Sequence, residues 1–382
     1  MALKYYHISF LLCVIIISHI SYCCCLNLSQ QQRKQQQRGQ PKTPPLFIFG
    51  DSIFDVGNNN YINTTTLDQA NFWPYGIDFF HFSTGRFSDG RLISDFIVEH
   101  AHQPSIPPYL QPGKRRFSHG VNFASAGAGA LVETFQGSVI DLHMQVRNYK
   151  EVEKWYKQKY GEVKARKRIQ SGVYLFSVGI NDYTSLFLTN STLSTTYTKH
   201  AYVSMVISNI TSVINEIYKM GGRKFGFLNI PPVGCIPALK LIADANGECL
   251  KDAITFARLH NEAIFHALKL LANKLPGFKY SLYDFYTSTL QRMKHPSKYG
   301  YKEAETACCG TGKYRGLFSC GGKRVIKEYE LCHNINDYLF WDSIHFTEKT
   351  NMQIAYEMWN NTNYVHDFPG ASYTFKELFF IR

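Results

Sequence analysis

The sequence predicts a single α/β domain, in which a parallel sheet of about five strands is flanked by helices. Five short apolar runs, each followed by a glycine or a polar turn, alternate with longer stretches whose apolar residues recur at helical spacing. Strands that alternate with helices pair in parallel through crossover connections, so this pattern indicates a parallel sheet covered by helices. Neither an internal repeat nor a shift in composition marks a second domain.

The predicted strands are almost continuously apolar, as expected for strands that are buried on both faces of a sheet. In chain order they cover 46–49, 120–123, 173–178, 225–230 and 280–283. The clearest helices are expected at 91–101, 142–160, 197–220, 251–275 and 348–359. The hydrophobic content of 45% is enough to bury a full core.

The first 25 residues have the features of a secretory signal peptide. Lys4 precedes a mostly apolar run over 8–20, and small residues follow within 21–25. The apolar run is too short to favour a transmembrane helix, and an uncleaved anchor is the alternative. Residues 26–44 are polar, basic and rich in glutamine, so we expect a disordered linker before a folded domain over 45–382. The protein is therefore predicted to be extracellular, with no transmembrane segment.

Cysteine usage agrees with secretion. Four of the ten cysteines lie in or beside the predicted signal, and the remaining six form an even set, which suggests disulfides. Cys235 with Cys249 is the most local pairing, and the adjacent pair at 308–309 is expected to bond outward to Cys320 and Cys332. A zinc site is the alternative, which the oxidising compartment and the poor spacing of the nearby histidine disfavour.

The formal net charge of +12 is high. A basic surface can attract nucleic acid, an anionic membrane or an acidic polysaccharide. The positive residues are scattered and no nucleic-acid-binding motif is present, so we expect no nucleic-acid partner and a generally solvated basic surface. Charge-driven association with the cell wall or an anionic membrane is the corresponding hypothesis. Candidate glycosylation sequons begin at Asn27, Asn63, Asn190, Asn209 and Asn360.

Polar motifs follow the first three predicted strands. Asp51-Ser52 follows the first strand, Ala126-Gly127 the second, and Gly179-Ile180-Asn181-Asp182 the third. In open parallel sheets, sites form beyond the carboxyl ends of the strands. Because chemically useful groups follow three strands, we expect an active site at the carboxyl edge of the sheet.

A nucleophile, a base and an orienting acid can be assigned from the residues. Ser52 is the candidate nucleophile, which needs a base to remove its proton. His345 suits proton transfer near neutral pH, and Asp342, three residues earlier, can orient its imidazole. Gly50 permits a sharp turn, and we expect a helix to begin after Ser52 and present N–H groups to an oxyanion. The alternatives are a helix cap at Asp51-Ser52 and a plain loop before the last helix at 342–345.

Gly127 and Asn181 are the candidate oxyanion donors. A backbone N–H and an amide side chain aimed at one oxygen stabilise a tetrahedral intermediate, and losing one donor typically costs roughly 3 kcal/mol. The alternative roles are a loop glycine and a turn residue. The glycine-rich segment 124–130 lacks the spacing and the acidic residue of a dinucleotide-binding fingerprint.

Four blocks of the sequence stand out together. They are Phe-Ile-Phe-Gly-Asp-Ser-Ile-Phe-Asp-Val-Gly-Asn-Asn-Asn at 47–60, the glycine block at 120–129, Val-Gly-Ile-Asn-Asp-Tyr at 178–183 and Asp-Ser-Ile-His at 342–345. In combination they resemble the plant GDSL esterase/lipases, within the SGNH hydrolase superfamily. All occur in the family's order, and the similarity extends from Pro45 to Trp359. Ile53 stands in place of the family's leucine and Phe346 in place of a frequent proline, and neither change removes a catalytic group.

The resemblance implies a flavodoxin-like sheet order and an extracellular carboxylic ester hydrolase of the apoplast or cell wall. It implies Ser52 as the nucleophile, His345 as the base and Asp342 as the orienting acid, with an oxyanion hole formed by the Ser52 N–H, Gly127 and Asn181. The substrate would be a lipid or another acyl ester, cleaved through an acyl-enzyme without a metal or cofactor. The alternatives are an acyltransferase that uses the same intermediate, and a lipid- or carbohydrate-binding defence protein without turnover.

Overall fold

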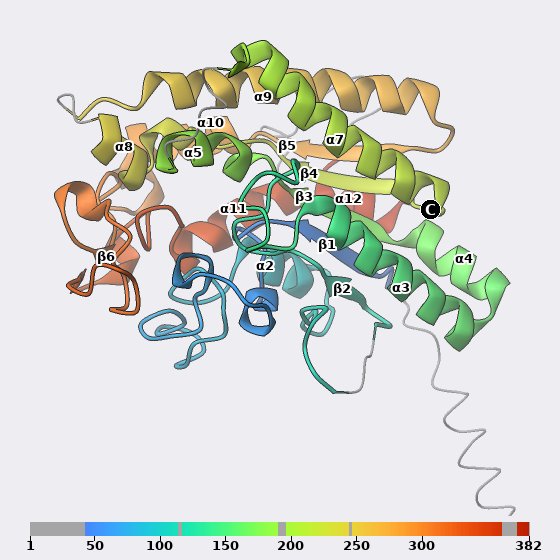
Figure 1. The fold of residues 1–382 in the computed structure, drawn as a ribbon. Coiled ribbons are helices and arrows are strands. Elements are labelled where there is room, and N and C mark those ends of the chain that lie inside the picture. Colours follow the sequence, from blue (N-terminus) through green and yellow to red (C-terminus); the bar gives the residue numbers. More distant parts are fainter. Residues whose placement is uncertain (1–42, 114–116, 190–195, 244–246, 361–372, 382) are drawn as a thin grey trace, which may run out of the picture. The chain divides into compact units, whose positions relative to one another are not determined.

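The computed structural model describes residues 43–113, 117–189, 196–243, 247–360 and 373–381. Its centre is a parallel sheet in the order β2-β1-β3-β4-β5 (Figure 1). The strands are β1 (Leu46–Gly50), β2 (Gly120–Asn122), β3 (Val173–Ser177), β4 (Lys224–Leu228) and β5 (Lys279–Tyr283). This is the flavodoxin-like order, so the expected α/β fold class is confirmed.

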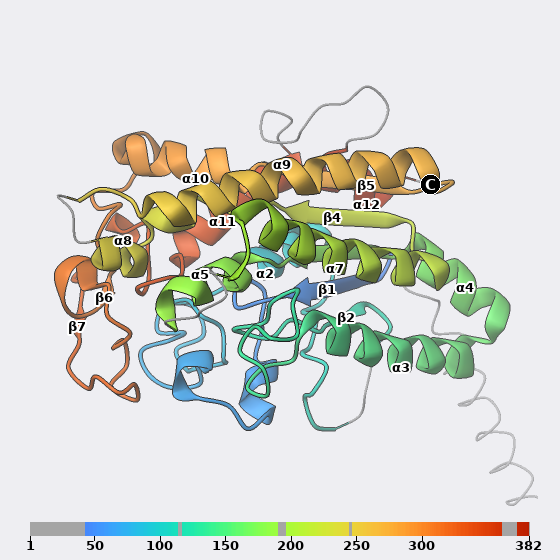
Figure 2. The same ribbon diagram turned by 45° about the horizontal axis from the view of Figure 1, so that its top comes forward.

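Helices cover both faces of the sheet, as Figures 1 and 2 show. On one face lie α3 (Leu142–Tyr160), α7 (Lys199–Lys219) and α9 (Lys251–Lys274). On the other lie α2 (Ile93–His100), α11 (Glu348–Asn360) and α12 (Phe375–Phe380). All five expected helices are present, with bounds shifted by at most two residues. Further helices are α4 (Glu162–Ser171), α5 (Ile180–Leu188), α8 (Pro237–Ala243) and α10 (Phe285–Lys294).

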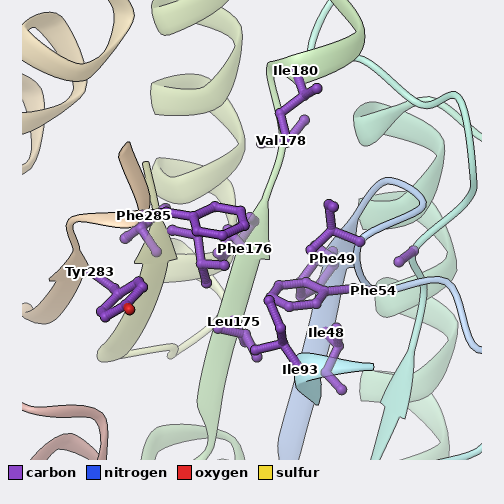
Figure 3. Packing of buried hydrophobic residues seen from close by; sticks show 14 of the residues in the cluster. Ile48, Phe49, Phe54, Ile93, Leu175, Phe176, Val178, Ile180, Tyr283 and Phe285 are labelled. Atoms are coloured by element: carbon purple, nitrogen blue, oxygen red, sulfur yellow. The ribbon is translucent and has the colours of Figure 1, made fainter. Parts of the chain in front are cut away.

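An aromatic row crosses the sheet and fixes the register of its central strands. Phe49 of β1 stacks on Phe176 of β3 at 4.9 Å between ring centroids, and Phe176 stacks on Phe227 of β4 at 5.1 Å. These residues are direct partners in the ladder, and Figure 3 shows the first two among the buried side chains. Each aromatic pair contributes about 0.5–1.5 kcal/mol beyond its buried area. The apolar character of the predicted strands therefore reflects burial between two helical layers.

A second, smaller core lies beside the sheet and contains disulfides. Its buried aromatic members are Phe72, Tyr75, Phe87 and Trp341. Two short antiparallel strands, β6 (Cys309–Gly310) and β7 (Glu330–Leu331), border it. The bridges are Cys235–Cys249, Cys308–Cys332 and Cys309–Cys320. This is the expected pairing, and the zinc alternative is wrong because all six cysteines are oxidised.

Several sequence-based assignments lie outside the described residues. These are the signal peptide, the linker up to residue 42, and the sequons at Asn27 and Asn190. Asn63 and Asn360 are exposed, whereas Asn209 is half-buried in α7 and its side-chain oxygen contacts His143. None of the helices in the described ranges is long and apolar enough to cross a bilayer.

Candidate active site

Ser52 follows β1 in a tight turn that glycine makes accessible. Gly50 has a φ of +141°, and a Cβ at this position would lie 2.0 Å from the Ser177 carbonyl oxygen of β3. The Asp51 N–H donates to that same oxygen at 3.1 Å. A side chain at residue 50 would therefore push apart the two strands that flank the site, and only glycine fits.

The expected helix after Ser52 is wrong. The Phe54 and Asp55 N–H groups both donate to the Asp51 carbonyl, which closes a single turn. The Asp55 carboxylate then accepts the N–H groups of Gly57 and Asn58 at 2.8 and 2.6 Å. This side chain takes donors that would otherwise continue helical pairing, so the chain leaves the turn at once.

A continuous set of hydrogen bonds joins Ser52, His345 and Asp342. His345 Nε2 lies 2.8 Å from Ser52 Oγ, and His345 Nδ1 lies 2.8 Å from Asp342 Oδ1. The three residues are 9%, 7% and 4% exposed, respectively. The fold thus brings together all three residues that the sequence proposed for the triad.

Asp342 is held as a carboxylate. Burial alone would raise its pKa, but the charge of His345 and several hydrogen bonds hold the pKa of Asp342 well below its ordinary value. Two of these bonds come from the backbone N–H groups of Ile344 and His345, at 2.9 and 2.8 Å. A charged acid at Nδ1 keeps the imidazole proton on that side and leaves Nε2 free to accept the serine proton.

The loop that carries His345 is fixed by its flanking residues. The Trp341 N–H donates to the His345 carbonyl at 2.7 Å, and the Phe87 ring lies 4.6 Å from the imidazole. Phe346 is 2% exposed and stacks on Phe340 at 5.3 Å. Phe346 therefore anchors this loop in the core by packing.

Two buried aspartates hold the loop after β2. Asp55 accepts the Ala126 N–H at 3.0 Å, on the side of the loop nearest β1. Asp182, at the start of α5, accepts the N–H groups of Ala130 and Leu131 at 2.8 and 2.9 Å. The segment that contains Gly127 is therefore clamped from both ends by carboxylates.

The three candidate oxyanion donors follow neighbouring strands. Gly127 comes after β2, Ser52 after β1 and Asn181 after β3. The Asn181 amide donates one N–H to the Ala128 carbonyl at 3.0 Å, which places this side chain against the Gly127 loop and leaves its second N–H. Within the described part of the chain, the N–H groups of Ser52 and Gly127 have no hydrogen-bond partner. All three groups thus retain a donor for a ligand.

Burial also changes the protonation of carboxyls around the turn that carries Ser52. It raises the pKa of Asp51 to about 7, and the pKa values of Asp55 and Asp182 to about 6. Hydrogen bonds from backbone N–H groups oppose this effect in each case. Asp51 also keeps one carboxyl oxygen without a hydrogen-bond partner, so its neutral form is favoured by its surroundings.

Among the described residues, one cluster of three carboxylates has ligand atoms close enough together to hold a metal ion. Its members are Asp78, Asp89 and Glu348. Both Glu348 oxygens already accept hydrogen bonds from Arg91, at 2.7 Å to Oε1 and 3.2 Å to Oε2. Asp89 in turn accepts the Glu348 N–H at 2.8 Å. These contacts occupy the cluster within the protein, and we assign no metal to it.

Two residues behind the triad were not found in the sequence, one in contact with Asp342 and the other in contact with the first. The Tyr75 hydroxyl donates to Asp342 Oδ2 at 2.7 Å, and Arg324 donates to the Tyr75 oxygen at 3.0 Å. Both lie in loops outside the four sequence blocks, Tyr75 23 residues after Ser52 and Arg324 18 residues before Asp342. No periodicity or spacing signals such a contact, because only the fold brings these loops together.

An Asp-His-Ser hydrogen-bond chain beyond the carboxyl ends of a flavodoxin-like sheet is the arrangement that serine hydrolases use. Residues 46–358 match the family described as GDSL-like Lipase/Acylhydrolase. The chain is 55% identical to GDSL esterase/lipase 5 of Arabidopsis thaliana, over 89% of each chain. It is 51% identical to GDSL esterase/lipase 2 of the same plant, over 82% of this chain and 85% of the relative. It is 47% identical to a GDSL lipase of Tanacetum cinerariifolium, over 84% of each chain.

The chain therefore belongs to the GDSL-like lipase/acylhydrolase family, a family of carboxylic ester hydrolases. The resemblance inferred from four sequence blocks is confirmed at this level.

Proposed function

We propose that this protein is an extracellular serine esterase that cleaves carboxylic esters through an acyl-enzyme on Ser52. The observation that carries the proposal is the hydrogen-bond chain from Asp342 through His345 to Ser52 Oγ, with 2.8 Å at each of its two links. A serine hydroxyl that already donates to an imidazole can lose its proton as it attacks a carbonyl carbon.

The reaction proceeds in two steps. Ser52 Oγ attacks the ester carbonyl while His345 Nε2 takes the hydroxyl proton, and the resulting oxyanion accepts hydrogen bonds from the Ser52 and Gly127 N–H groups and from Asn181. His345 then gives the proton to the leaving alcohol, and an acyl-enzyme remains. In the second step His345 removes a proton from water, which attacks the acyl carbon and releases the acid and free Ser52. Asp342 stabilises the imidazolium in both steps.

The three disulfides support the extracellular location, because such bonds persist in oxidising compartments. The natural substrate is a lipid or another acyl ester. The net charge of +12 supports association with an acidic wall polysaccharide or an anionic membrane surface, which strong salt should reverse.

Replacing the nucleophile tests the proposal. We expect Ser52→Ala to lower kcat on p-nitrophenyl esters by roughly 10⁴-fold or more, the size of effect seen when a catalytic serine is removed. Ser171→Ala is the matched control, because this serine bonds only its own helix at the end of α4 and should keep full activity. Turnover that survives in Ser52→Ala would show that another group is the nucleophile. Adding glycerol as an acceptor and identifying the products would reveal acyl transfer in place of hydrolysis.

A further inference from the structure

We propose that Tyr75 and Arg324 are positioning residues that hold Asp342, and through it His345, in the reactive arrangement. This inference rests on the proposed function, because it assigns the two residues a role behind the same triad. Neither residue belongs to the sequence blocks that carry the catalytic groups. Tyr75 is 1% exposed and Arg324 is 3% exposed, so both polar groups need partners inside the protein.

The direction of the hydrogen bonds is fixed by chemistry. A guanidinium can only donate, so Arg324 Nη2 donates to the Tyr75 oxygen at 3.0 Å. The Tyr75 hydroxyl has one proton, which it donates to Asp342 Oδ2 at 2.7 Å. Burial and the nearby Asp342 charge raise the pKa of Tyr75 well above its ordinary value, so this proton stays in place. The result is a one-way series of donors that ends on the catalytic carboxylate.

This series fixes the rotation of the Asp342 carboxylate. Oδ1 accepts the His345 Nδ1–H and the two backbone N–H groups of Ile344 and His345. Oδ2 lies 3.0 Å from the same imidazole nitrogen, and Tyr75 is the tight donor on its far side. Without the Tyr75 hydroxyl, Oδ2 would lose its strongest partner and the carboxylate could turn about its terminal bond. The imidazole would then be less firmly aimed at Ser52.

Arg324 lies in a segment that the disulfides tie to the triad. It lies inside the loop closed by the Cys308–Cys332 bridge, four residues after the end of the Cys309–Cys320 bridge. The Cys308 and Cys309 N–H groups donate to the carbonyls of Phe340 and Trp341, at 2.9 and 2.7 Å. These carbonyls directly precede Asp342 in the chain. The same stretch of backbone therefore carries the catalytic acid and anchors the loop that presents Arg324.

The guanidinium is held on a second side as well. Its other nitrogen donates to the Thr66 carbonyl, and its charge opposes the rise in the pKa of Asp68 that burial causes. The contact to Thr66 therefore helps to fix the nitrogen that donates to Tyr75.

Tyr75→Phe removes only the hydroxyl and tests the positioning role directly. We expect kcat per active serine to fall about 10-fold while KM changes less than about 2-fold, the rate equivalent of one lost hydrogen bond to a charged group. Active serines are counted by complete titration with a fluorophosphonate, so unfolded protein does not enter the value. Tyr156→Phe is the matched control, because this buried hydroxyl donates to the Phe117 carbonyl away from the triad. That variant should keep the kcat of the wild type.

Two Arg324 variants separate positioning from simple packing. We expect Arg324→Gln to lower kcat per active serine while KM changes less than about 2-fold, and Arg324→Lys, which retains a charged donor, to restore much of the loss. A wild-type kcat in both Tyr75→Phe and Arg324→Gln would overturn the inference. Ser52→Ala is assayed alongside. If it retains turnover, the proposed function itself fails, whereas an inactive Ser52→Ala beside an unaltered Tyr75→Phe rejects only the positioning role.

Discussion

Asp55 and Asp182 hold the loop that follows β2, next to the candidate nucleophile Ser52. Each accepts backbone N–H groups of the loop that carries Gly127, and Asp182 also accepts the Thr134 hydroxyl at 2.7 Å. A carboxylate can accept several donors at once, which no other side chain of this size does. These aspartates therefore define where the Gly127 N–H lies relative to Ser52.

Asp182→Asn should disturb that loop. The new amide nitrogen is a donor and would face at least one of the N–H groups of Ala130 and Leu131, so a hydrogen bond is lost and a repulsive contact is gained. We expect kcat to fall at least about 10-fold, because a displaced oxyanion donor costs roughly 3 kcal/mol when it is lost completely. Steady-state kinetics on a p-nitrophenyl ester provide the measurement.

Asp141→Asn is the control for this substitution. Asp141 caps α3 by accepting the Met144 N–H at 2.9 Å, and asparagine caps helices equally well. The Asp141→Asn variant should therefore keep the kcat of the wild type. Equal activity in the two variants would contradict the role assigned to Asp182.

The sequence predicted the triad more fully than its supports. Ser52, Asp342 and His345 lie in short motifs whose residue types state their chemistry, and the fold joins all three. Tyr75 and Arg324 could not be predicted, because a tyrosine and an arginine in loops have many ordinary roles. Their position depends on the smaller core, which forms only when distant segments pack together.

Secondary structure was predictable where periodicity is long or burial is continuous. All five strands of the sheet and the five expected helices lie where the apolar patterns indicated. The two-residue strands β6 and β7 carry no such pattern, and they are paired because disulfides hold their neighbours. The sequence predicted a helix after Ser52, but the structure has a single turn there. The Asp55 side chain accepts the next backbone N–H groups and so ends helical pairing.

The junction of β1 and β3 should tolerate no side chain at residue 50. In Gly50→Ala the Cβ would meet the Ser177 carbonyl at 2.0 Å, so one of the two central strands must move. We expect a loss of unfolding free energy of roughly 4 kcal/mol or more, as for other severe steric disruptions. Urea unfolding followed by circular dichroism measures this loss.

Gly300→Ala separates the clash from backbone strain. Gly300 is also left-handed, with φ +78° and ψ +25°, but the nearest atom to a Cβ there is the flexible end of Lys349. Gly300→Ala should therefore lower the free energy of unfolding by only roughly 1–2 kcal/mol. If the two variants unfold at the same urea concentration, close approach of the strands is not what requires Gly50.

For the molecule as a whole, buried carboxyls set the pH dependence of stability. Burial raises the pKa of Asp89 and Asp51 to about 7, and that of Asp55 and Asp182 to about 6. Between pH 4 and pH 7 the folded state therefore binds more protons at these sites than the unfolded state does. The stability that they contribute is complete near pH 4 and is lost as the pH rises through 6 and 7.

Two other groups act in the opposite direction. Burial lowers the pKa of His260 to about 3, so its contribution to stability grows as the pH rises toward its unfolded value of 6.5. The lowered pKa of Asp342 removes stability when the pH falls below about 4. Above pH 4, four carboxyls lower the stability as the pH rises, whereas one histidine increases it. We therefore expect the melting temperature to rise as the pH falls from 8 to 5.

Thermal unfolding across this pH range tests the expectation. Asp89→Asn should flatten the dependence, because it removes one of the four titrating carboxyls at a distance from the triad. A melting temperature that is constant or higher at pH 8 would mean that these carboxyls stay charged in the folded protein.

The separation of the proposed catalytic groups along the chain matters while the protein is being synthesised. Ser52 and His345 are 293 residues apart, and the fold is what unites them. A ribosome adding 5–20 residues per second needs roughly 15–60 s to pass from one to the other. Throughout that interval Ser52 lacks the imidazole that is proposed to activate it. On the proposed mechanism, ester cleavage can therefore begin only after the segment leading into α11 has been synthesised and docked.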